Sequence, residues 1–353
     1  PGPAQSDCLE YVQVVSFGCG HDAYLSDEII RLMHEISGKI PLVLKAGRER
    51  HPGPLAHPCP VLPGDGGHGK RAKKKRLEPR ELKDPYPVKF EKKDRADKVV
   101  LVPNTSHAFS RIMAASFAGQ GVKTVPLEIG RGEAIRLGKQ YVHNDICFPA
   151  QIVIGEALEA LRSGKYDPDH TAIAMGKYVG DCRLTHYSAL LRKALDDAGF
   201  AQVPILTNDD QDSHNLHPGY KMNLKASLRI AFAMPMIDVL EELLRKIRPY
   251  ETVKGSADKA FEKAMDLVIH GLEKHGIRGA AKGFREAMHV MDAVGYDRSR
   301  KKPGVLIVGE YLLNFHPGAN HDIEAYLEKN GFEIIEARMT DVIRRFTLTK
   351  IPR

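Results

Sequence analysis

The chain has 353 residues, 42% of them hydrophobic and 27% charged, with five cysteines and a formal net charge of +7. This composition is that of an ordinary globular protein with two or three domains, and so few scattered cysteines exclude a secreted disulfide framework. The sequence contains no apolar run of about 18 residues and no signal-peptide pattern at its start, so we expect a cytoplasmic protein with reduced thiols and no membrane contact.

A β-α-β unit is predicted at the start of the chain. Residues 11–15 are rich in β-branched side chains, a glycine turn around Cys19 follows, and a helix passes through residues 27–33 with Ser26 as its N-cap. Residues 40–44 provide a second strand, which such a unit pairs in parallel with the first. A partial α/β lobe is therefore expected in residues 1–45.

Regular structure is then interrupted over residues 46–96. Residues 46–69 are rich in glycine, proline and histidine and have neither helical nor strand periodicity. The run KRAKKKR at Lys70–Arg76 supplies most of the excess positive charge, and the rest of the chain is almost neutral. We interpret the segment as an irregular basic linker, because a nucleic-acid partner has no other support in the sequence.

Alternating strands and helices resume in residues 97–219 and predict a layered parallel sheet. Its expected strands are 98–102, 123–127, 171–175 and 203–206, and its expected helices are 109–118, 150–161 and 187–198. The fold class is therefore α/β, with Rossmann-like lobes built on parallel sheets.

A helical subdomain is expected in residues 220–300, because apolar residues recur there at intervals of three and four and indicate three helices. Met234 and Met236 lie in this insert, and we interpret them as core residues. A last β-α-β unit in residues 301–353 has strands at 304–308 and 332–335. It provides only two strands, which suggests that the polypeptide is truncated.

Three cysteines lie where a strand or loop is predicted to meet a helix: Cys19 in SFGCG, Cys147 in NDICFP and Cys182 in GDCR. The positive end of a helix stabilises a thiolate, and thiolates bind soft metals and iron-sulfur clusters. A lone cysteine is more often a small buried residue, and the chain has no CxxC pair for a zinc ribbon or ferredoxin loop. Cys8 and Cys59 are interpreted as incidental.

Three longer phrases resemble a known family. They are VQVVSFGCGHDAYLSDEIIRLMHEISGK, YVHNDICFPAQIVIGEALEALRSGKYD, and the stretch from MGKYVGDCRLTHYSALLRKALDDAGF through VPILTND. The sequence around them resembles the C-terminal part of acyl-CoA dehydratase activase-related proteins, which are similar to 2-hydroxyacyl-CoA dehydratase subunits and double-cubane cluster proteins. The resemblance covers roughly residues 10–45 and 75–340.

This resemblance implies a cytoplasmic protein of anaerobic metabolism that binds an iron-sulfur cluster, either a four-iron cubane or a double cubane. Cys147 and Cys182 would be ligands, with Cys19 as the third ligand or a ligand of a neighbouring cluster, while Asn144, Asp145 and Arg183 would orient the loops. An ATP-hydrolysing activator domain or subunit would supply electrons, and an acyl-CoA dehydratase is a further expected partner. A homodimer would provide the six cysteines that a double cluster needs.

The sequence departs from the family pattern in two places, and both the function and the role of Arg183 have an alternative interpretation. Relatives lack the segment at residues 46–69 and continue beyond Arg353, so we hypothesise a fragment with a frameshift between about residues 45 and 70 and another near Arg345. The alternative function is a non-catalytic scaffold lobe that binds a dehydratase or its activator without a cluster. For Arg183, a surface ion pair is an equally good interpretation.

Overall fold

The computed structural model describes residues 12–16, 29–36, 38, 42–46, 86–143, 146–176, 182–207, 217–220, 223–307, 311–335 and 338–341. By the proximity of Cα atoms the chain divides into two compact units. The first comprises Pro1–Asp84, Asp145–Cys147 and Val179–Arg183, and the second comprises Pro85–Asn144, Phe148–Tyr178 and Leu184–Arg353. Both units contain parallel strand pairs and helices, which confirms the predicted α/β class.

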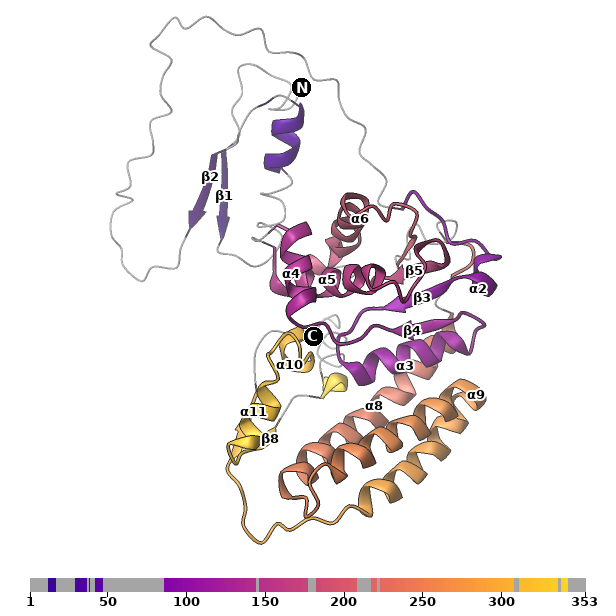
Figure 1. Ribbon diagram of the computed structural model, residues 1–353, viewed down its shortest axis with the longest axis vertical. Helices are drawn as coiled ribbons and strands as arrows, with labels where there is room; N and C mark the ends of the chain where they lie inside the picture. The colour runs from indigo at the N-terminus through magenta and orange to yellow at the C-terminus, as the bar shows by residue number, and fades with distance from the viewer. Residues whose placement is uncertain are drawn as a thin grey trace, which may run out of the picture. The chain divides into compact units, whose positions relative to one another are not determined.

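The first unit contains the predicted β-α-β element. Strand β1 (Val12–Ser16) pairs in parallel with β2 (Leu42–Ala46), and residues 29–36 between them are helical (Figure 1). The parallel pairing that the sequence predicts is therefore confirmed. Cys19, Ser26 and the segment at 47–85, with its basic run and its hypothesised frameshift, lie outside the described residues.

The second unit is built on a four-stranded parallel sheet with the order β4-β3-β5-β6. Its strands are β3 (Val99–Val102), β4 (Thr124–Pro126), β5 (Thr171–Ala174) and β6 (Ile205–Leu206). The central strands β3 and β5 are nearly all apolar because both faces of the sheet are covered by helices, as parallel sheets require.

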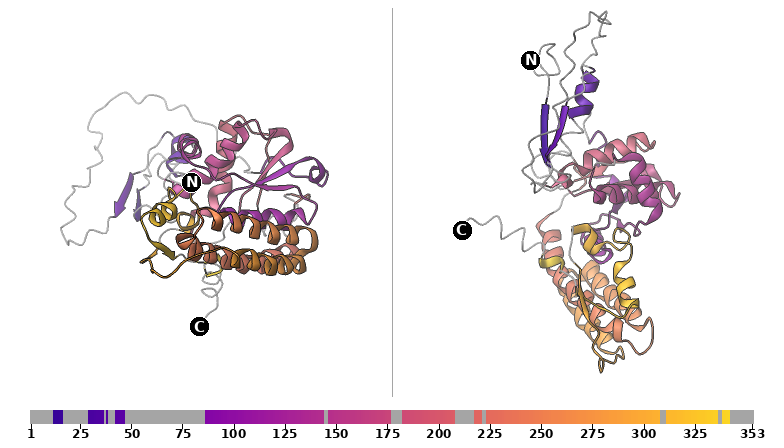
Figure 2. Two further views of the ribbon diagram at one scale, coloured as in Figure 1. Left: turned by 60° about the horizontal axis from the view of Figure 1, so that its bottom comes forward. Right: turned by 90° about the vertical axis from the view of Figure 1, so that its left-hand side faces the viewer.

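Helix α3 (His107–Ala118) covers one face, and α5 (Phe148–Arg162) and α6 (Tyr187–Asp197) cover the other (Figures 1 and 2). Ser106 caps α3, because its hydroxyl accepts the N–H of Phe109 at 3.0 Å. The short helix α2 (Asp94–Asp97) precedes β3.

The sequence patterns did not predict helix α4 (Gly132–Tyr141), which packs along α5. Two glycines allow the two backbones to approach. A Cβ at Gly138 would lie 1.9 Å from the carbonyl oxygen of Gln151, and one at Gly155 would lie 1.8 Å from that of Ala134. The helix thus depends on a tertiary contact that the local sequence does not reveal.

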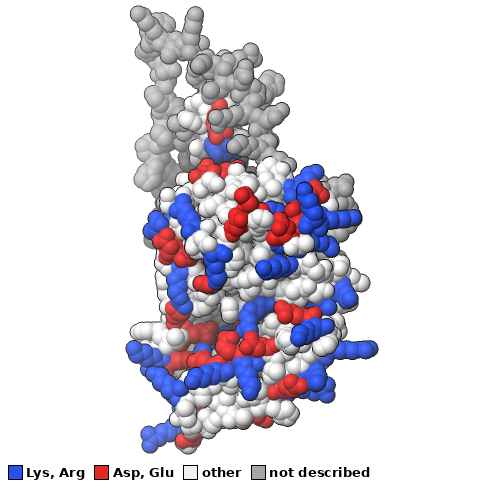
Figure 3. Space-filling view, turned by 45° about the vertical axis from the view of Figure 1, so that its right-hand side comes forward, with Lys and Arg blue, Asp and Glu red and all other residues white. Residues whose placement is uncertain are grey.

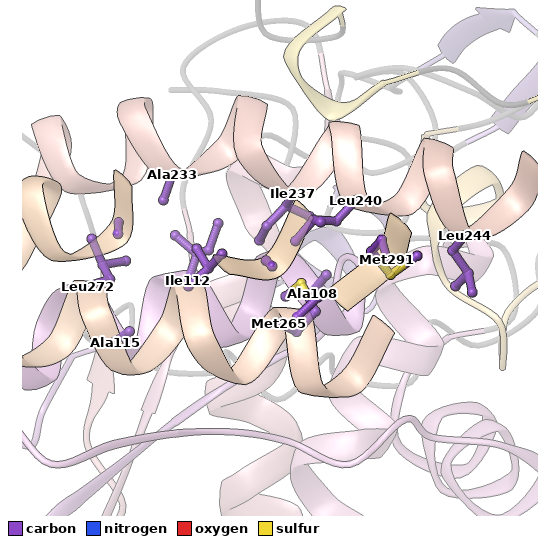
Figure 4. Packing of buried hydrophobic residues seen from close by; sticks show 14 of the residues in the cluster. Ala108, Ile112, Ala115, Ala233, Ile237, Leu240, Leu244, Met265, Leu272 and Met291 are labelled. Atoms are coloured by element: carbon purple, nitrogen blue, oxygen red, sulfur yellow. The ribbon is translucent and has the colours of Figure 1, made fainter. Parts of the chain in front are cut away.

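A helical layer packs on the outer side of α3. It consists of α8 (Leu224–Ile247) and α9 (Ser256–Asp292), and α9 bends at Gly276, where φ is 61°. The three predicted helices therefore correspond to α8 and the two halves of α9. Their shared core with α3 contains Ala108, Ile112, Ala115, Ala233, Ile237, Leu240, Leu244, Met265, Leu272 and Met291 (Figure 4).

The C-terminal β-α-β unit packs against α8. Strands β7 (Gly304–Leu306) and β8 (Glu333–Ile335) pair in parallel around α10 (Tyr311–Phe315) and α11 (Ile323–Lys329). Arg248, the C-cap of α8, bonds Glu328 of α11 twice, at 2.7 and 2.9 Å. Met234 packs with Phe315 and Met339, and Met236 contacts the bundle core, so their interpretation as core residues is confirmed.

No helix in the described part of the chain is long and apolar enough to cross a membrane. On the face drawn in Figure 3, basic and acidic side chains are interspersed. This described face therefore lacks the single-sign basic stripe that is typical of nucleic-acid binders.

Burial of Glu241 on α8 gives a pH-dependent stability. Loss of hydration raises the pKa of Glu241 to about 7, and nearby Arg245 offsets this only in part. An acid whose pKa is higher in the folded state destabilises the fold as pH rises through that interval. We expect Glu241→Gln to raise the free energy of unfolding by about 2–3 kcal/mol at pH 8 and by less than about 1 kcal/mol at pH 5.

Urea unfolding at the two pH values measures this effect. Glu242→Gln is the matched control, because Lys246 and Arg338 hold the pKa of Glu242 below its usual range. Its replacement should therefore lower stability slightly at pH 8. An equal gain from Glu241→Gln at both pH values would contradict the prediction.

Candidate functional site

The order of strands points to the carboxyl edge of the four-stranded sheet. The chain passes from β3 to β4 on one side, and then crosses over to β5 and β6 on the other. In open parallel sheets ligands bind outside the carboxyl ends of the strands, at the point where the winding reverses. Here that point lies between the ends of β3 and β5.

Cys147 directly precedes helix α5 and is half-buried. The end of α5 leads to the start of the sheet, where His170 contacts Asp97 at 3.0 Å, just before β3. The first turn of α5 therefore lies toward the carboxyl edge. Pro149 occupies the second position of the helix, as the sequence predicts, and the N–H groups of the first turn lack intrahelical acceptors.

Cys182 lies in the segment that follows β5 and directly precedes the 3-10 helix η2 (Arg183–His186), which continues into α6. Its side chain is exposed. Arg183, by contrast, is only 4% exposed.

Cys147 and Cys182 belong to the same compact unit, which also includes Pro1–Asp84. Cys19, Asn144 and Asp145 lie outside the described residues. Among the residues that are described, no three His, Cys, Asp or Glu side chains converge on one point. Two of the three predicted sulfur ligands thus directly precede helices.

A buried cluster at the carboxyl edge was not predicted from the sequence. Glu156 of α5 lies beside His316, with 2.7 Å between Oε1 and Nε2, and both side chains are fully buried. The Glu156 carboxylate also accepts the N–H groups of Gly130 at 2.6 Å and Asn104 at 3.3 Å. These bonds join the ends of β3 and β4, helix α5 and the segment after α10.

The tautomer of His316 follows from its other contact. Its Nδ1 atom accepts the N–H of Ala319 at 3.0 Å, so Nε2 bears the proton that faces Glu156. Polar residues directly after β3, such as Asn104, were the only local signal of this cluster. The histidine comes from a segment 160 residues away from Glu156, which no local pattern connects.

Two further polar atoms at this edge are buried and have no hydrogen-bond partner among the described residues. They are Oδ1 of Asn104, directly beyond the end of β3, and Oγ1 of Thr207, the residue after β6. Buried polar atoms are almost always satisfied, so such orphans near strand ends are consistent with a polar binding region.

Comparisons of the sequence and structure with family models, curated proteins and solved structures gave no significant match.

Proposed function

We propose that this protein is an iron-sulfur redox component of an ATP-dependent reductase or 2-hydroxyacyl-CoA dehydratase activation system, located in the cytoplasm. The observation that supports it is the position of Cys147 and Cys182, which both precede helices and belong to one compact unit. Two cysteines that directly precede helices are a reason to expect a sulfur-ligated group.

Each residue of the proposed site has a separate role. Cys147, Cys182 and Cys19 would ligate the cluster, while Asn144 and Asp145 would shape the loop before Cys147. The buried Arg183 would balance negative charge on the ligating sulfurs. When bound, a cluster supplies one-electron transfer at low potential, and an ATP-hydrolysing activator is the proposed electron donor.

Analysis of iron and acid-labile sulfide tests this proposal. The protein is purified without oxygen, its iron and sulfide are measured per chain, and its visible absorption spectrum is recorded. We expect roughly four or more of each per chain, with a broad absorption that bleaches on reduction. Absence of both after anaerobic reconstitution would overturn the proposal and favour a scaffold lobe that binds a dehydratase or its activator.

A further inference from the structure

Arg229 on α8 is a buried cation for which the described residues provide no counter-ion. Arg229 is only 7% exposed. Its Nη1 atom is fully buried and has no hydrogen-bond partner among the described residues, and no ion pair involves the residue in that part of the chain. Because a guanidinium cannot give up its proton in a protein, this charge must be balanced in another way.

The guanidinium lies between two glycines at one end of the helical layer. A Cβ at Gly119, which caps α3, would lie 1.5 Å from Nη1 of Arg229. A Cβ at Gly276, at the bend of α9, would lie 3.4 Å from both Nε and Nη2. Gly119 and Gly276 follow Ala115 and Leu272, respectively, by one helical turn, and Arg229 precedes Ala233 by one turn. Ala115, Leu272 and Ala233 belong to the core drawn in Figure 4.

The helix ends around Arg229 do not satisfy its N–H groups. The ends of α3 and of the first half of α9 favour a cation weakly through their dipoles. The second half of α9, however, starts directly after Gly276 and adds N–H groups that lack intrahelical acceptors. The Nε2 atom of Gln120, next to Gly119, is another buried donor without a partner in the described residues. Nη1 of Arg229 and Nε2 of Gln120 are therefore two buried donors without an acceptor among the described residues.

We infer that Arg229, together with Gln120 and the start of the second half of α9, binds a small oxyanion group. A planar guanidinium matches the two oxygens of a phosphate or a carboxylate, and the N-terminus of a helix is a common site for such groups. Neither Cys147 nor Cys182 is among the residues from which this niche is inferred, so the inference does not depend on the proposed cluster.

Isothermal titration calorimetry of the full chain with inorganic phosphate, and separately with acetate, tests this inference at constant ionic strength. We expect one saturable site in the wild-type protein and at least tenfold weaker binding in Arg229→Gln. Lys139→Gln, which removes an exposed charge on α4, should bind like the wild type. Binding of phosphate alone indicates a phosphorylated ligand, and binding of both anions indicates a ligand with a carboxylate.

A second variant guards against a folding defect in Arg229→Gln. Gly119→Ala retains the charge but places a methyl group against the guanidinium, so it should also weaken binding. Wild-type protein that binds neither anion would overturn the inference. Unchanged affinity in Arg229→Gln would overturn it equally, because the bound anion would then lie elsewhere.

Discussion

Glu156→Leu is expected to lower the free energy of unfolding by about 3–5 kcal/mol, the range seen when one partner of a buried pair is removed. The carboxylate accepts N–H groups from Gly130, Asn104 and His316, and its side chain is fully buried. Leucine fills a similar volume but accepts no hydrogen bond. Each donor left unsatisfied costs about 1–3 kcal/mol, and solvent cannot reach the site to replace the lost acceptor.

Urea unfolding followed by circular dichroism measures this loss. Glu159→Leu is the matched control, because Glu159 lies one turn further along α5 and is not fully buried. Burial and the nearby carboxylates of Glu133, Glu156 and Glu128 raise the pKa of Glu159, so its removal should change stability little or raise it. A loss below about 1 kcal/mol for Glu156→Leu would show that the cluster does not hold the edge of the sheet together.

Glu156→Leu should destabilise the C-terminal β-α-β unit before the rest of the protein. His316 follows α10 and is attached to the sheet by Glu156, whereas α11 is attached to α8 by the pairs of Arg248 with Glu328 and Arg245 with Glu324. Hydrogen exchange should therefore become faster in residues 311–320 than in α11 when Glu156 is replaced. Uniform acceleration across both helices would instead indicate that the whole unit unfolds cooperatively.

The sequence was sufficient to predict most elements of the fold, because their signals are local. Strand β3 is a continuous apolar run, and apolar residues recur at intervals of three and four along α8 and both halves of α9. Helix α4 was missed because its glycines, such as Gly138, are unfavourable in an isolated helix and are explained only by contact with α5. Local sequence predicts a helix well when its stability is also local.

The candidate site, like the fold, has features that the sequence predicts and features that it does not. The positions of Cys147 and Cys182 before helices could be predicted, because proline at the start of a helix and the alternation of elements are local features. The contact of Glu156 with His316 could not, because it joins segments with no shared pattern. The burial of Arg229 without a partner for Nη1 among the described residues likewise depends on how α3, α8 and α9 pack, which no local pattern predicts.

Cys147→Ala is expected to reduce bound iron from roughly four atoms per chain to nearly none. The proposed cluster has at most three cysteine ligands from one chain, so loss of one leaves two, too few to retain it in competition with solvent or a chelator. Cys182→Ala should have a similar effect, although its exposed side chain would allow an external thiol to replace it in part. Iron analysis and electron paramagnetic resonance of the reduced protein measure the loss.

Cys59→Ala and Cys8→Ala provide the matched controls, since both remove a thiol from the same chain at positions that are not proposed as ligands. They should retain the iron content and the spectrum of the wild type. If all four variants lost iron equally, the metal would be bound adventitiously by exposed thiols. If only Cys147→Ala and Cys182→Ala lost it, the two helix starts would be established as the site, because replacing a thiol by a methyl group at those positions removes a ligand and leaves the helix dipoles in place.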